Sequence, residues 1–179
     1  MAQIERPRRR DRARDEAWIR ECLARAPFGV VACVRDGRPY QNPLLFVFDG
    51  ERDAIYLHTG RHGRTREAFE GGVLVSFCVA EMGRILPAGA AIDFSVEYAS
   101  VVVSGDGSVV DDPAEATRAL ALLMDKYAPQ FRAGADYRPT SAADLERTSV
   151  LRIRISSWGG KENRKPEFPG AYPYRGGPS

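Results

Sequence analysis

Apolar residues along the chain occur mainly in short alternating runs, and turn residues separate these runs. Alternation with a period of two is typical of strands with one buried face. The strictest example, from Ile92 to Tyr98, predicts a half-exposed strand. Asp36-Gly37 is a strong signal for a two-residue hairpin, and Pro43 marks an edge, a bulge or a bare backbone position in a strand. The runs that predict strands cover residues 28–34, 40–48, 54–59, 73–79, 92–110 and 150–155.

Helical patterns occur in four further stretches. Proline supports two of their boundaries, since Pro27 follows the first helix and Asp112-Pro113 opens the third. The stretches cover residues 18–23, 64–70, 113–127 and 141–147. The glycine-containing segment 81–91 and the chain from residue 158 onward predict irregular structure. The patterns together predict a mainly β (α+β) fold, a six-stranded antiparallel β-barrel with peripheral helices.

Composition places the chain among globular proteins. It has 179 residues, of which 44% are apolar and 28% charged, enough for one hydrophobic core. No apolar run approaches the ~20 residues of a membrane-spanning helix, and no apolar stretch follows the N-terminal arginines as in a signal peptide. We therefore expect a soluble, cytoplasmic protein. We divide it into an Arg-rich flexible arm (1–14), one domain (15–163) and an irregular C-terminal tail (164–179).

The positive charge is concentrated near the N-terminus. Residues 6–14 hold six Arg and one Asp, whereas the rest of the chain is net acidic. A basic arm can bind phosphate backbones, but this one lacks interleaved aromatic residues and a groove-reading helix, which argues against nucleic-acid recognition. We expect a solvated tail.

Cysteine and histidine usage argues against a metal centre. The spacing of Cys22, Cys33 and Cys78 matches no zinc-ligand pattern, so we expect reduced, mostly buried thiols. Only two histidines, His58 and His62, are present, too few for a multi-histidine metal site. Redox chemistry in this chain would therefore depend on a bound organic cofactor.

The segment from His58 to Thr65 has the composition of a phosphate cradle. Its two glycines allow close backbone approach to a ligand, and Arg61 and Arg64 can hold phosphate oxygens. An ordinary basic turn fits the same spacing equally well, because the segment is neither a Walker A motif nor a dinucleotide fingerprint.

Two other segments carry weaker signals. Trp158 and Lys161 are separated only by two glycines, although a tryptophan after a strand is usually a core residue and a lone lysine is usually solvated. In segment 41–44, Pro43 interrupts the strand, so backbone N–H and C=O groups there could form hydrogen bonds with the edge of a heteroaromatic ring.

Three segments carry a resemblance to a known family: DAIYLHTGRHGRTREAF, AEMGRILPAGAAIDFSVEYASVVVSGDGSVVDDP and RTSVLRIRISSWGGKEN. Their most specific parts are His58-Thr59, 83–87 and 158–163. In this order they resemble the split-barrel flavoproteins related to pyridoxamine 5'-phosphate oxidase, and more narrowly the Nim-type 5-nitroimidazole-resistance proteins. The resemblance covers roughly residues 15–163.

The resemblance implies a split β-barrel that binds FMN as a homodimer, with two flavin sites that both chains share. It implies a flavin-dependent oxidoreductase that reduces nitroimidazole-like or other small heteroaromatic substrates, with His58 as the catalytic proton donor. No metal is expected. The residues implied in cofactor binding are Asn42, Pro43, Leu44, His58, Thr59, Arg61, Arg64, Thr65, Trp158 and Lys161.

Two alternatives remain open. The chain could hold a flavin or a haem without turnover, with His58 as an axial haem ligand. It could also oxidise pyridoxamine 5'-phosphate, but that activity needs a second basic pocket, for which Arg84 is the one obvious donor in segment 81–91.

Overall fold

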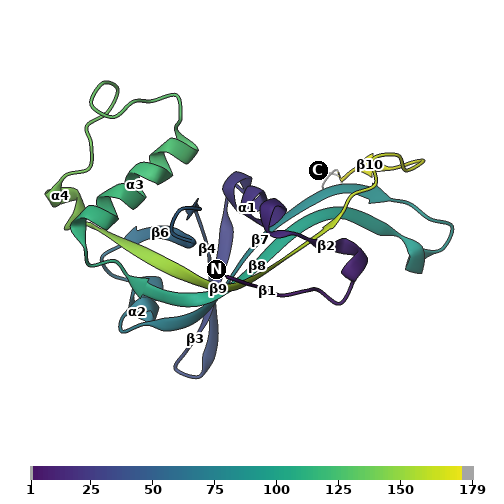
Figure 1. Ribbon diagram of the computed structural model, residues 1–179, viewed down its shortest axis with the longest axis horizontal. Coiled ribbons are helices and arrows are strands. Elements are labelled where there is room, and N and C mark those ends of the chain that lie inside the picture. Colours follow the sequence, from purple (N-terminus) through teal and green to yellow (C-terminus); the bar gives the residue numbers. More distant parts are fainter. Residues whose placement is uncertain (1, 175–179) are drawn as a thin grey trace, which may run out of the picture.

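The centre of the molecule is one large, mainly antiparallel sheet (Figure 1). The structure, a computed structural model, describes residues 2–174. Seven strands form the main path in the order β4-β3-β7-β8-β9-β6-β5. They are β3 (Gly29–Arg35), β4 (Arg38–Leu44), β5 (Phe46–Asp49), β6 (Ala54–Gly60), β7 (Val73–Leu86), β8 (Ser95–Val109) and β9 (Thr148–Asn163). The predicted class, a mainly β antiparallel split barrel with peripheral helices, is confirmed.

The described residues form ten strands, whereas the sequence predicts six. One predicted strand, 40–48, breaks at Leu45 into β4 and β5. Three further strands have two residues each: β1 (Gln3–Ile4), β2 (Ala13–Arg14) and β10 (Tyr172–Pro173). The predicted hairpin is confirmed, because Asp36 and Gly37 both have positive φ angles of 50° and 72°. Pro43 lies on β4, at one end of the strand path, where a missing N–H donor is tolerated.

Strands β7 and β9 extend through two segments for which the sequence predicts irregular structure. In β7, a register shift between Met82 and Ile85 accommodates Gly83 within the pairing with β8. In β9, glycine is needed for close packing: a Cβ at Gly159 would lie 2.5 Å from the backbone oxygen of Glu5. Gly83 and Gly159 therefore lie inside strands, so the prediction of irregular structure was wrong for residues 81–86 and 158–163, whereas residues 87–90 and 164–171 hold no helix or strand.

The alternation from Ile92 to Tyr98 predicts a strand, but only its second half lies in one. Ile92 lies in a short 3-10 helix, η2 (Ala91–Asp93), and is 92% exposed, while β8 begins at Ser95. Glu97 is buried, because its carboxylate receives two charge-assisted hydrogen bonds from Arg84. A polar pair thus occupies the face that the pattern assigns to solvent.

Four helices lie around the sheet: α1 (Glu16–Arg25), α2 (Arg64–Phe69), α3 (Pro113–Tyr127) and α4 (Ala142–Leu145). Figure 1 shows α3 and α4 over one end of the sheet, far from β10. Side-chain caps explain where they start: Asp15 accepts a hydrogen bond from the backbone N–H of Trp18, and Asp112 accepts one from that of Ala114. All four helices agree with the sequence patterns. None of the helices in residues 2–174 is both long and apolar enough to cross a membrane.

The core has two parts. The larger lies inside the barrel, and its biggest fully buried side chains include Trp158, Phe46, Phe69 and Phe77. The smaller lies between α3 and the outer face of β5, β6 and β9; its buried members are Val47, Ala54, Tyr56, Ala116, Ala119, Leu123 and Val150. The sheet is therefore covered on its outer face at the α3 end.

The N-terminal segment, predicted as a flexible arm, is paired with the sheet. Strand β1 pairs with β9 at Ser157 and Trp158, and β2 pairs with β9 at Gly160 and Lys161. Arg14 forms an ion pair with Glu162 at 2.7 Å. Residues 3–4 and 13–14 therefore lie on the sheet, at the two ends of the basic segment.

The predicted C-terminal tail also contacts the sheet, because β10 pairs with β7 at Arg84 and Ile85. The part of the predicted tail at 175–179 lies outside the described residues. All three cysteines are free; Cys22 is buried, and Cys33 and Cys78 are half-buried.

Candidate functional site

Strand β4 and helix α2 meet at a small polar cluster. The Thr65 hydroxyl accepts a hydrogen bond from the Asn42 amide at 2.9 Å and forms another with the Tyr40 hydroxyl at 2.7 Å. Thr65 is buried, so these bonds fix the first turn of α2 against β4. Tyr40 was missed by the sequence reasoning, although alternation places it on the same side of β4 as Asn42.

Two arginines beside this cluster have no acidic partner. Arg64 lies over the Tyr40 ring, with its guanidinium carbon 5.9 Å from the ring centroid. Among the residues that the structure describes, neither Arg61 nor Arg64 has a carboxylate within 4.0 Å, whereas nearby Arg35 and Arg66 are paired with Glu67 and Glu70. Exposed guanidinium groups without partners can accept an anionic ligand at little cost in broken ion pairs.

His58 and Thr59 lie at the end of β6, directly before this basic turn. The His58 side chain is exposed and Thr59 is half-buried, with Thr59 paired to Ser149 of β9. Arg66 of α2 donates a hydrogen bond to the Ser149 hydroxyl at 3.1 Å. Strand β6, helix α2 and strand β9 therefore hold the segment 58–65 in place from both ends.

Pro43 and Leu44 follow Asn42 on β4 and point in opposite directions. Pro43 is exposed, opposite Val30 of β3, and Leu44 packs at the margin of the barrel core. Among the ten predicted cofactor residues, Asn42 and Thr65 are in direct contact, and the other residues of segments 42–44 and 58–65 lie on β4, β6 and the turn into α2.

Trp158 and Lys161 lie in a different region of the chain. Trp158 is 1% exposed, packs edge-on against Phe48 and lies beneath the Arg20 guanidinium. Its ring therefore presents no surface to a ligand. Lys161 is exposed, but it lies 12 residues along β9 from Ser149, which corresponds to a separation on the order of 30–40 Å in a strand.

Lys161 has its own small cavity of about 220 Å³, between the N-terminal segment and β8. Its ammonium group lies 5.4 Å from the Tyr98 ring centroid. Ser100 also lines this cavity, and its buried hydroxyl has no hydrogen-bond partner in the described part of the chain. An unsatisfied buried hydroxyl beside a cation is a place where another group can bind.

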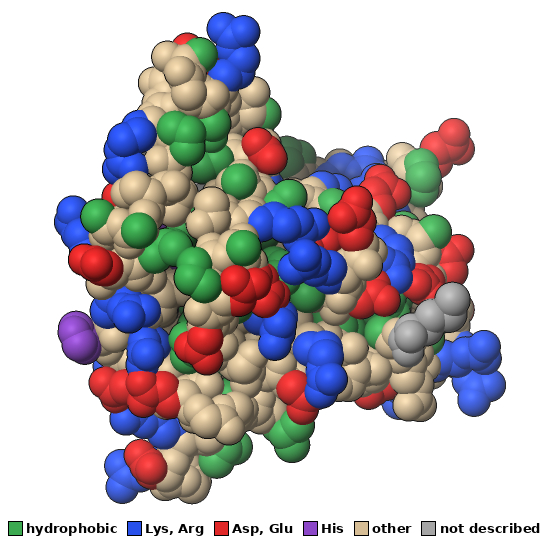
Figure 2. Space-filling view, turned by 60° about the vertical axis from the view of Figure 1, so that its left-hand side comes forward, with side chains coloured by type: hydrophobic (Ala, Val, Ile, Leu, Met, Phe, Trp, Pro, Cys, Tyr) green, Lys and Arg blue, Asp and Glu red, His purple; other side chains and the backbone are tan. Residues whose placement is uncertain are grey.

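The surface charge is mixed. On the face seen in Figure 2, Lys and Arg side chains are interspersed with Asp and Glu side chains and form no single basic band. This face lacks the continuous basic stripe that nucleic-acid binding needs.

Comparison with known proteins identifies relatives of the whole domain. Residues 15–162 match the pyridoxamine 5'-phosphate oxidase family. A comparison with curated proteins found no match.

Several solved structures share the fold. The flavocytochrome Anf3 from Azotobacter vinelandii has a TM-score of 0.80 at 24% identity, over 94% of this chain and 82% of that one. The FAD- and haem-binding protein from Mycobacterium smegmatis has a TM-score of 0.78 at 22% identity, over 89% and 82%. A candidate 5-nitroimidazole antibiotic resistance protein from Bacteroides thetaiotaomicron has a TM-score of 0.61 at 20% identity, over 83% and 84%.

Proposed function

The chain belongs to the pyridoxamine 5'-phosphate oxidase family, and from this premise we propose that it is a flavin-dependent oxidoreductase acting on small heteroaromatic substrates such as nitroimidazoles. The observation that supports this most is the turn between β6 and α2, where Arg61 and Arg64, which have no carboxylate partner within residues 2–174, precede a fixed Thr65. A phosphate group of a flavin fits this turn by charge. Structural neighbours described as binding FAD support the same choice of cofactor.

Each element of the site has a role in this proposal. Arg61 and Arg64 hold the phosphate, and Thr59 offers a hydroxyl to the ribityl chain. Pro43 exposes a backbone segment without an N–H donor to the ring. A bound flavin supplies hydride transfer, and the protein supplies binding, orientation and protons. Because its ring is buried, Trp158 contributes in this proposal by holding β9 in place.

His58 is the proposed proton donor. It is exposed at the end of β6, next to the turn, and histidine is the side chain best suited to exchange protons near neutral pH. We expect His58→Ala to retain flavin, measured by absorbance near ~450 nm, but to lose turnover of a 5-nitroimidazole by roughly 100-fold or more. His62→Ala is the matched control, because His62 is also exposed, four residues away. Wild-type turnover of His58→Ala would exclude His58 from the reaction.

We further propose that two copies of the chain build each site. Lys161 cannot reach the flavin of its own chain if the phosphate lies at 58–65, so only a second copy could bring it to the ring. Exposed apolar side chains on the outer face of β3 and β8 support such an interface: Val34 is 65% exposed and Val102 45%. A flavin-loaded monomer in sedimentation velocity would contradict this proposal, and loss of flavin affinity in Lys161→Ala would support it.

Haem binding is the second candidate. Of the two neighbours with TM-scores near 0.8, one is described as a flavocytochrome and the other as binding haem, and His58 is an exposed imidazole that could serve as an axial ligand. The visible spectrum of the purified protein decides between the two, since haem gives an intense Soret band and flavin does not. Pyridoxamine 5'-phosphate oxidation has less support, because the side chain of Arg84 is already engaged by Glu97.

A further inference from the structure

A cleft of about 830 Å³ lies outside the site described above. It is on the outer face of the sheet, where β6, β9 and β8 run side by side below the start of α3. Its volume is in the range of pockets that hold cofactor-sized ligands. Three arginines line it: Arg52, Arg152 and Arg154.

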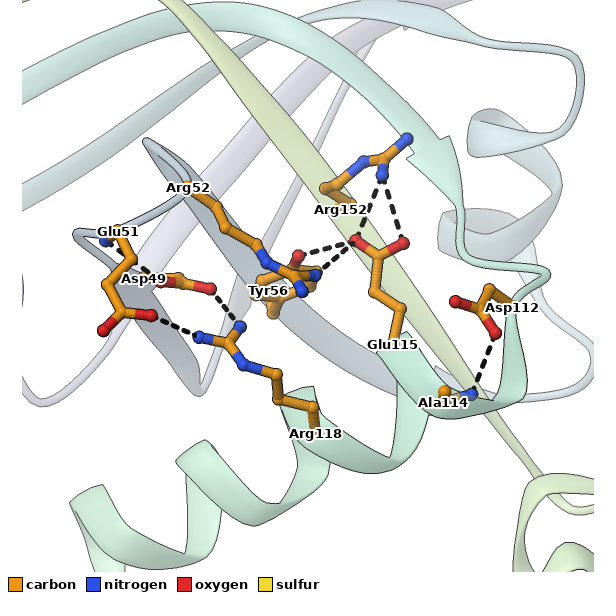
Figure 3. A network of polar contacts seen from close by, with 9 residues as sticks. All are labelled: Asp49, Glu51, Arg52, Tyr56, Asp112, Ala114, Glu115, Arg118 and Arg152. Carbon is orange, nitrogen blue, oxygen red and sulfur yellow. Dashed lines mark hydrogen bonds and ion pairs between the residues drawn. The ribbon is translucent and has the colours of Figure 1, made fainter.

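A network of hydrogen bonds and ion pairs around Glu115 includes two of these arginines (Figure 3). The Glu115 carboxylate accepts hydrogen bonds from Arg152 at 3.0 and 3.2 Å and from the Tyr56 hydroxyl at 2.6 Å. Arg52 approaches the same carboxylate to 3.9 Å. Glu115 thus accepts hydrogen bonds from two side chains and forms an ion pair with a third, and the guanidinium group of Arg152 is positioned before any ligand arrives.

The cleft retains positive charge and an unused donor. Its three arginines face only two carboxylates, those of Glu115 and Asp106, and Arg154 remains 73% exposed while it pairs with Asp106. The Nε atom of Arg152 is buried and has no partner among the described residues. These features favour a ligand that brings negative charge between the arginines.

The remaining lining fits a sugar and an apolar ring. Ser108 and Asp106 offer hydroxyl and carboxylate groups of the kind that bind ribose hydroxyls. Leu74, at the β7 side of the cleft, exposes 77% of its surface and could pack against a base. A diphosphate, a ribose and a planar base therefore match the three kinds of surface in the cleft.

The cleft is also next to the proposed flavin site. Tyr56, in its floor, lies two residues before His58 on the same face of β6, at a spacing of ~7 Å. We propose that the cleft binds the adenosine diphosphate group of a dinucleotide. This group occurs both in FAD and in nicotinamide dinucleotides, so the inference rests on the proposed function but specifies what the second half of the ligand contacts.

The test uses ADP as the direct probe, with FMN, FAD and NADPH as further arms. Arg52→Gln and Arg154→Gln remove one cation each from the cleft but leave Glu115 bonded to Arg152 and Tyr56, so both variants should fold. Arg132→Gln is the matched control, because Arg132 is 82% exposed and lies outside the cleft. By calorimetry we expect each cleft variant to bind ADP about tenfold more weakly than the wild type, while the control and all FMN affinities stay unchanged.

The measurements with FMN, FAD and NADPH show whether the adenosine diphosphate group belongs to FAD or to the electron donor. If FAD is the ligand, it binds the wild type more tightly than FMN, and this advantage disappears in the cleft variants. If the electron donor is the ligand, the variants instead raise KM for NADPH in the FMN-loaded protein. ADP that does not bind, or binds equally to all variants, would overturn the inference. Binding of ADP without any binding of FMN would uphold the cleft and refute the proposed flavin site.

Discussion

Lys126, near the C-terminal end of α3, has its ammonium group inside the protein. The Nζ atom is buried, has no hydrogen-bond partner among the described residues, and lies 3.7 Å from the centroid of the Phe46 ring. Burial lowers the pKa of Lys126 from 10.5 to about 8. The charged form is therefore destabilised at neutral pH, and replacing this lysine with an apolar residue should stabilise the fold.

The magnitude follows from the shift in pKa. At 1.36 kcal/mol per pKa unit, a fall from 10.5 to about 8 corresponds to ~3 kcal/mol. Partial solvent exposure of the side chain reduces this value, and the cation–π contact with Phe46 offsets roughly 0.5–2 kcal/mol more. We expect Lys126→Met to raise the free energy of unfolding by about 1 kcal/mol at pH 7, since methionine has a similar shape.

The pH dependence provides the sharper test. Between pH 8 and 10.5 the unfolded chain binds a proton at Lys126 that the folded protein has released, so the wild type gains stability as the pH rises through this window. The methionine variant lacks this gain. Urea unfolding at pH 7 and pH 10, at fixed protein concentration, should show that the advantage of the variant shrinks at the higher pH. A difference that is the same at both pH values, or a variant that is less stable at pH 7, would refute the reasoning. Lys165→Met, at an exposed position, is the control and should change stability by less than ~0.5 kcal/mol.

Three more predictions concern packing, acid stability and thiol chemistry. Gly105→Ala should lower the unfolding free energy by ~2 kcal/mol, because its Cβ would lie 2.3 Å from the backbone oxygen of Arg154; an unchanged urea midpoint would contradict this. The pKa of Glu97 is lowered from 4.5 to about 2, first by its hydrogen bonds to Arg84, so the stability it contributes is present above pH 4.5 and is lost as the pH falls toward 2. Hydrogen exchange at the Lys165 amide, which donates to Glu97 at 2.9 Å, should accelerate over that range beyond its intrinsic rate, and Glu97→Gln should already exchange faster at pH 6. Burial raises the pKa of the Cys22 thiol to about 11, so thiol reagents at pH 8 should label Cys22 only after denaturant is added; rapid labelling of the native protein would show that the helix α1 opens.

Strand positions could be predicted from the sequence where a short apolar, β-branched or aromatic run is bounded by turn residues. Segments 28–34 and 54–59 are such runs, and the hairpin at Asp36-Gly37 has a local conformational cause. The apolar run of β9 ends at Ile155, but the strand continues, because Gly159 and Gly160 are needed for contacts with residues about 140 to 155 positions earlier. No local pattern contains that information.

The candidate site could be predicted from the sequence only where its residues are close together in the chain. Residues of the turn 58–65 are close in sequence, so their proximity follows directly from the chain. The contact of Thr65 with Tyr40 and Asn42 joins elements 23 to 25 residues apart and needs the sheet order. The separation between His58 and Lys161 depends on the length of β9, which the sequence analysis underestimated.

The pairing of the short N-terminal strand β1 with β9, the last long strand, has a consequence for how the chain folds. Gln3 pairs with Ser157, and β9 also separates β6 from β8 in the sheet, so neither the N-terminal strands nor the barrel can close until β9 is available. During synthesis, β9 is made after strands β1 to β8. Contacts between residues so far apart in sequence make folding slow. Until β9 pairs with them, the edges of β6 and β8 are unpaired and can aggregate. Low growth temperature or a chaperone should therefore increase the soluble yield more than changes to the surface would.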